Sequence, residues 1–112
     1  MTCLNRIRDA LLAVTAEVYH FHAHKPSPPY IVWAEDGAGA VVVANGRMQN
    51  QVITGTVDLF TDDPEDTTLF EGVQAALDGV CAWRLNSIQY EDETGLTHCE
   101  WAWEVPNGQD DV

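Results

Sequence analysis

Three histidines, His20, His22 and His24, alternate with other residues just before a proline-rich segment. Residues two apart share one face of a strand, so this spacing is one that metal sites use. On a flat strand, however, the α-carbons of His20 and His24 would lie roughly 13 Å apart, at the limit for two imidazoles that share one ion. On a helix these two residues could meet, yet the sequence does not contain the H-E-x-x-H motif of helical zinc sites. We expect exposed histidines and no resident metal, with a metal site at this triplet as the alternative.

Other reactive groups form no catalytic pattern. Ser27 and Ser87 are the only serines, and neither stands in a G-x-S-x-G turn. Cys99 follows a histidine, but neighbours on a strand point to opposite faces and cannot form a thiolate–imidazolium pair. The glycines at 37 and 39 lack the rest of a dinucleotide-binding motif, and there is no P-loop. We therefore expect a protein that is not an enzyme and has no cofactor.

Charge differs strongly between the two halves of the chain. Eighteen acidic and five basic residues give a net charge of −13. Residues 1–56 are balanced, whereas fourteen carboxylates in the remainder face a single basic residue, Arg84. Such a charge keeps a protein soluble and repels nucleic-acid phosphates. Seven of these acids gather in two short segments: Asp62, Asp63, Glu65 and Asp66, and then Glu91, Asp92 and Glu93.

The length of 112 residues suits one domain with its own core. We predict this domain at residues 1–105 and a disordered acidic tail at 106–112. Three cysteines without a C-x-x-C pair favour a reducing compartment. The N-terminal apolar run between Asp9 and Glu17 is only five residues long, so no signal peptide is expected. No run approaches the roughly 20 residues that cross a bilayer, so no membrane anchor or membrane partner is expected.

Apolar periodicity predicts the first elements. A helix is expected from about residue 3 to 18, because its apolar residues recur at steps of three and four. Three prolines within residues 26–29 prevent that helix from continuing. A strand is predicted at 30–35, a glycine-containing turn at 36–39 and a short returning strand at 40–44.

The second half begins with the longest predicted strand, 49–61, in which Gly55 indicates a bulge or a close backbone approach. Asp and Pro residues in 61–66 predict the start of a helix, and Gly79 indicates its end. Strands are expected at 83–90 and 97–105, joined by an acidic hairpin turn that contains Gly95. In the last strand Cys99, Trp101, Trp103 and Val105 should face the core, and His98, Glu100 and Glu104 the solvent.

The resulting order, α-β-β-β-α-β-β, predicts an α+β fold. An antiparallel sheet of four to five strands would carry both helices on one face. All seven elements lie within the predicted domain.

Four segments carry a resemblance to a known family. They are Tyr30 to Gly37 (YIVWAEDG), Met48 through Gly55-Thr56-Val57-Asp58 to Thr61, Trp83 to Glu91 (WRLNSIQYE) and Glu100 to Val105 (EWAWEV). In this order and spacing, over residues 15–105, the chain resembles the tail terminator or tail-completion (minor tail) proteins of long-tailed phages and prophages. These proteins are small α+β domains with a sheet flanked by helices.

The resemblance implies a homohexameric ring in the tail of the virion, assembled in the host cytoplasm. Such a ring caps the tail tube, stops its polymerisation and joins the tail to the head, so its partners are further copies of itself, the tail-tube protein and the head-closure protein. DNA would pass through without specific binding, and an acidic bore would not retain it. The seven clustered acids are candidates to line that bore or to face the tube. Two alternatives are another head–tail connector or minor tail protein, and a small metal-binding protein that uses His20, His22 and His24.

Overall fold

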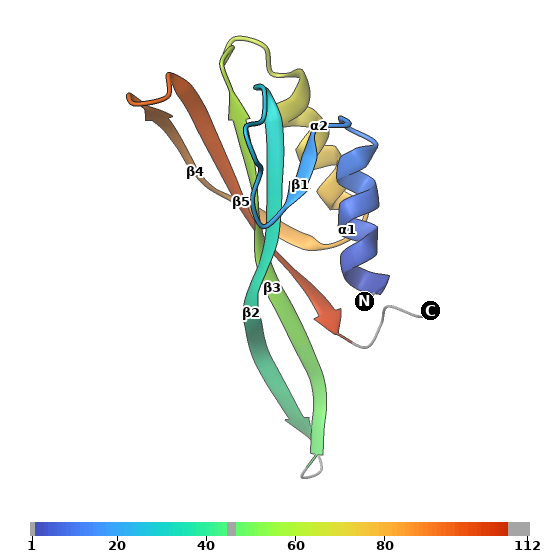
Figure 1. Cartoon of the computed structure of the whole chain (residues 1–112). Coiled ribbons are helices and arrows are strands. Elements are labelled where there is room, and N and C mark those ends of the chain that lie inside the picture. The colour runs from blue at the N-terminus through green and yellow to red at the C-terminus, as the bar shows by residue number, and fades with distance from the viewer. Residues whose placement is uncertain (1, 45–46, 108–112) are drawn as a thin grey trace.

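The computed structural model describes residues 2–44 and 47–107. In this part of the chain the strands form one five-stranded sheet, in the order β1-β2-β3-β5-β4. Figure 1 shows both helices on one side of that sheet. The predicted α+β class and the order α-β-β-β-α-β-β are confirmed. The elements are α1 (Thr2–Leu12), β1 (Val18–His20), β2 (Tyr30–Ala44), β3 (Arg47–Thr61), α2 (Thr68–Asp78), β4 (Ala82–Glu91) and β5 (Leu96–Asn107).

The core lies between the helices and the sheet. Helix α1 buries Ile7 and Leu11, and α2 buries Val73 and Leu77. Both helices show the apolar spacing of three and four residues that produces one buried face. The sheet contributes alternate residues from its three central strands, as the two-residue period of a strand requires. These residues are Ile31, Trp33, Ile53, Val57, Leu59, Cys99, Trp101, Trp103 and Val105, so the inward side of the last strand is confirmed.

Helix α1 ends six residues earlier than predicted, because the chain gains a strand there. Val18 to His20 pair in parallel with Ile31 to Trp33, and this pairing satisfies backbone groups that a longer helix would have used. The hydroxyl of Thr15 accepts a hydrogen bond from the amide of Glu17 and helps to turn the chain. The sheet is therefore mixed, with the other strand pairs antiparallel.

The predicted turn at residues 36–39 is wrong, and the two strands around it are one strand, β2. The glycines are accommodated by register shifts against β3 between residues 35 and 37 and between 38 and 41. Because β5 pairs with β3 only from Gln51 onward, the far part of β2 and β3 forms a two-stranded ribbon. This ribbon gives the molecule its elongated shape, 52 × 25 × 24 Å (Figure 1).

Helix α2 starts later than predicted. The acidic segment forms turns first, in which Asp63 and Asp66 accept hydrogen bonds from backbone amides two residues on. Gly79 follows the last helical residue, as predicted, and Gly95 has a positive φ of 73° in the hairpin turn. Strand β5 continues to Asn107, so the predicted tail cannot begin at residue 106, and residues 108–112 lie outside the described part.

Candidate functional site

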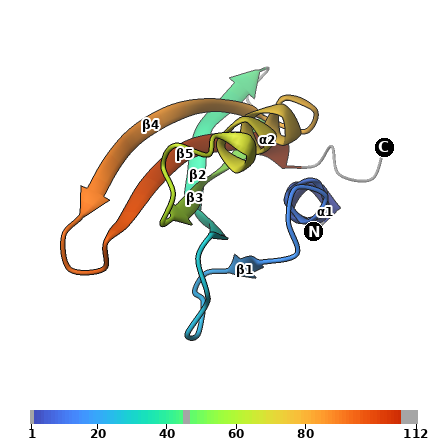
Figure 2. The same cartoon turned by 90° about the horizontal axis from the view of Figure 1, so that it is seen from above.

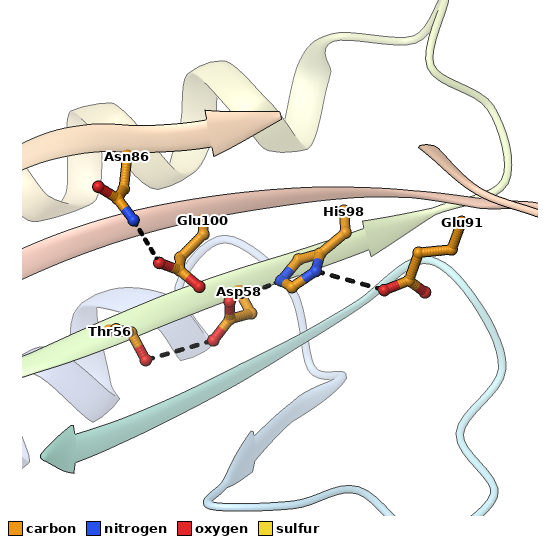
Figure 3. A network of polar contacts seen from close by, with 6 residues as sticks. All are labelled: Thr56, Asp58, Asn86, Glu91, His98 and Glu100. Carbon is orange, nitrogen blue, oxygen red and sulfur yellow. Dashed lines mark hydrogen bonds and ion pairs between the residues drawn. The ribbon is translucent and has the colours of Figure 1, made fainter. Parts of the chain in front are cut away.

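A network of polar side chains lies on the face of the sheet that the helices leave open (Figure 3). Asp58 on β3 and Glu100 on β5 are direct cross-strand partners. His98 lies on the same face, two residues before Glu100, and its Nε2 atom is 2.6 Å from Oδ1 of Asp58. Its Nδ1 atom is 3.4 Å from a carboxylate oxygen of Glu91, the last residue of β4. Three carboxylates thus surround one imidazole.

Two neutral side chains fix the outer oxygens of this network. Thr56, which precedes Asp58 on the same face, donates a hydrogen bond of 3.3 Å to its Oδ2 atom. Asn86 donates one of 2.6 Å to Oε2 of Glu100, and it reaches that atom from an irregularity in β4 between residues 85 and 87. The second oxygen of Asp58 faces Nε2 of His98, as Figure 3 shows.

The network is half-buried, and its ionisable side chains influence one another. The side chains of Asp58 and His98 are 17% and 22% exposed. Burial raises the pKa of Asp58, the hydrogen bond and charge of His98 oppose this rise, and the nearby carboxylate of Glu100 adds to it. One potential ligand atom from each of Asp58, His98 and Glu100 lies within 4.8 Å of the other two. Such a group could bind a cation or share a proton.

A row of stacked rings fixes the orientation of His98. Its imidazole stacks on Phe60, with ring centroids 4.3 Å apart, and Phe60 stacks on Tyr30 at 4.9 Å. These residues face each other across β2, β3 and β5. Because the ring plane is held by this contact, the Nε2 atom is directed at Asp58.

The histidines predicted from sequence lie elsewhere. His20 stacks on Trp33 at 4.0 Å, and its Nε2 atom is 2.6 Å from Oε1 of Glu35. Burial alone would raise the pKa of Glu35, but the hydrogen bond and charge of His20 lower it. His22 and His24 follow the strand as exposed residues. Within the described residues, none of the three belongs to the group of metal-competent side chains that the fold brings together.

The clustered acids lie at one end of the molecule. Asp62, Asp63, Glu65 and Asp66 lie between β3 and α2. Glu91 ends β4, and Asp92 and Glu93 follow it in the turn to β5. Both segments are at the end opposite the tip of the ribbon (Figure 1). The structure thus places two acidic groups that are distant in sequence at the same end of the molecule.

Strand β4 carries an apolar surface that sequence reasoning missed. Leu85, Ile88 and Tyr90 are 40%, 55% and 65% exposed. They pair with Trp101, Cys99 and Thr97 of β5 and so share one face, but β4 curves away from the helices (Figure 2). β4 is also the outer strand of the sheet. We call Leu85, Ile88 and Tyr90 the apolar edge. The backbone of β4 is open for pairing on its outer side, and these three side chains are not covered by the helices.

A hollow of about 460 Å³ lies near the start of the same strand, with Trp83, Arg84 and Trp103 in its lining. The indole nitrogen of Trp103 is buried and has no hydrogen-bond acceptor among the described residues. The carboxylate residues Asp36 and Glu104 also belong to this lining.

Sequence reasoning placed His98 and Glu100 on the outer face but did not connect them with Asp58. That connection requires β3 to lie beside β5, which no local pattern encodes.

The chain matches no protein-family model and no curated protein. None of the described helices has the length and apolar character needed to span a membrane.

Proposed function

We propose that this chain is a non-enzymatic structural subunit of a phage tail, which assembles into a ring at the end of the tail tube. The ring would stop tail polymerisation and join the tail to the head. The observation that carries this proposal is the β2–β3 ribbon, which extends beyond the helix-covered part of the sheet. A two-stranded ribbon is marginally stable by itself, and residues 40–44 of this one are all apolar. Such an element suits contact with a neighbouring subunit.

The apolar edge of β4 supports the same proposal. A closed ring of identical subunits needs two different, complementary patches on each subunit. The ribbon and the apolar edge are two such patches, and an outer strand with exposed backbone groups is suited to pairing with another chain. The acidic end of the molecule would then face the bore or the tube, where negative charge does not retain DNA.

Native mass spectrometry of the untagged protein at high concentration, with and without chelator and tail-tube protein, tests this function. We expect a discrete sixfold assembly that is indifferent to chelator. The double variant I88S/Y90S should remain monomeric while keeping the wild-type circular dichroism spectrum. Q89S changes the opposite face of the same strand and is the matched control, which should assemble normally.

A monomer under all these conditions would contradict the proposal. So would an I88S/Y90S variant that assembles as well as Q89S, because the apolar edge would then have no part in assembly. A ring that forms but does not bind the tail-tube protein would instead indicate another kind of head–tail connector.

A further inference from the structure

The open face of the sheet places an imidazole nitrogen and two carboxylates around one point. Asp58 and Glu100 are cross-strand partners, and like charges in that position repel each other. The Nε2 atom of His98 is directed at Asp58 (Figure 3), and a carboxylate oxygen of Glu100 lies within 4.8 Å of both of these ligand atoms. With Glu91 on the other ring nitrogen, three carboxylates surround a ring that carries at most one positive charge. A divalent cation would offset this excess of negative charge more fully than a proton does.

We propose that Asp58, His98 and Glu100 form a binding site for a first-row divalent metal ion such as Zn²⁺. This inference does not depend on the proposed assembly function. Imidazole nitrogen and carboxylate oxygen are ordinary zinc ligands, and three protein ligands leave a position for water.

The distances suit such an ion after a small adjustment. The three ligand atoms lie within 4.8 Å of one another, whereas two ligands of a tetrahedral zinc ion are about 3.3 Å apart. Glu100 therefore moves inward, and the 2.6 Å contact between Asp58 and His98 opens by less than about 1 Å. Both adjustments are side-chain movements on strands whose backbone is fixed by cross-strand hydrogen bonds.

The surroundings of the three ligands resemble a second coordination shell. Metal-bound histidines usually donate their other ring N–H to a carboxylate, which fixes the tautomer, and Glu91 lies in that position. Thr56 and Asn86 each hold the outer oxygen of one ligand carboxylate. Stacking on Phe60 holds the ring plane of His98. Glu91, Thr56 and Asn86 are thus positioning residues of the site.

Isothermal titration of Zn²⁺ into the full-length protein tests this site. We expect one equivalent to bind, and both H98Q and E100Q to weaken binding at least about tenfold. E104Q removes the same charge four residues further along the same face of β5 and should leave the affinity unchanged within about twofold. H22Q controls for the other histidines and should also have no effect. Unchanged circular dichroism spectra would show that each variant is folded.

A second measurement identifies the ligand atom directly. In ¹⁵N NMR spectra, saturation with Zn²⁺ should shift the Nε2 resonance of His98 and leave that of His22 in place. Equal losses of affinity in E100Q and E104Q would overturn the proposal, because they would indicate non-specific attraction to an acidic surface. Loss of binding in H22Q, or no binding at millimolar Zn²⁺, would overturn it as well. Sixfold assembly is measured separately, so failure of one proposal does not decide the other.

Discussion

Gly55 lies directly opposite Trp103 on the neighbouring strand, and the indole ring of Trp103 fills the space that a side chain at position 55 would need. A β-carbon at this position would lie 2.6 Å from Cε2 of the indole and would also collide with the carbonyl oxygen of Ala34. Three strands therefore approach one another most closely around a residue without a side chain. The close backbone approach predicted from this glycine is confirmed.

Replacement of Gly55 by alanine should destabilise the fold. The added methyl group must displace a buried ring or a backbone carbonyl, and such overpacking costs about 1–3 kcal/mol or more. Urea denaturation of G55A should show this loss. G79A is the control, since its β-carbon would meet only a carbonyl oxygen at 3.7 Å. Equal stability of the two variants would mean that Trp103 packs differently.

Cys81 should be a poor nucleophile in the folded protein. Burial raises the pKa of its thiol to about 12, and the carboxylate of Asp78 adds to the rise. Because the thiolate is the reactive form, alkylation of Cys81 by iodoacetamide at pH 8 should be at least about a hundredfold slower in the native than in the urea-unfolded protein. Mass mapping of the alkylated peptide gives the rate for this site, and equal rates in the two states would refute the assignment.

The same thiol makes stability depend on alkaline pH. Its pKa is higher in the folded state than the ordinary value of 9.0, so the unfolded state loses its proton first. The contribution of the neutral thiol is complete below about pH 9 and is lost as the pH rises toward 12. The variant C81A should show a smaller decrease in melting temperature over this range than the wild type.

His20 should contribute to stability, whereas His22 should not. His20 stacks on Trp33 and is bonded to Glu35, but both partners of this ion pair are partly exposed, so H20Q should lose only about 1 kcal/mol. H22Q should be neutral. The pKa of Glu35 is lowered, so its stabilising effect is present above about pH 4.5 and disappears as the pH falls below the folded-state pKa. The difference in stability between wild type and H20Q should therefore decrease in acid to the part that comes from stacking on Trp33.

Reversal of the clustered acids tests their role in the proposed ring. Lysine substitutions at Asp62, Asp63, Asp92 and Glu93 leave the core untouched, since all four side chains are exposed. We expect normal folding but impaired tail joining or genome passage, measured as infectious particles per tail. Undiminished infectivity would remove these residues from the bore.

Local patterns predicted the buried faces better than the ends of the elements. The predicted burial of Cys99, Trp101 and Trp103 is confirmed. Alternate residues of a strand face the same side of the sheet, so the apolar set can only lie together on the buried side. The end of α1 was missed because Val18 continues the helical spacing, and only the backbone of β2 offers it a better partner. The glycines at 37 and 39 indicated a turn, yet pairing with β3 carries the strand through them.

Only part of the candidate cation site could be predicted from the sequence. His98 and Glu100 were placed on one face by alternation alone. Asp58 is forty residues away from His98, and its part in the site follows from the strand order. The exposure of Ile88 and Tyr90 was also unpredictable, since it results from the curvature of β4 away from the helices.

The central position of β3 has a consequence for synthesis on the ribosome. Its hairpin with β2 is local and forms quickly, but its second neighbour, β5, is separated from it by α2 and β4, and such distant pairings form slowly. Until residues 96–107 are available, the core lacks Trp101 and Trp103. The edge of β3 that pairs with β5 is then open. We therefore expect the core to close only after the last strand has paired with β3.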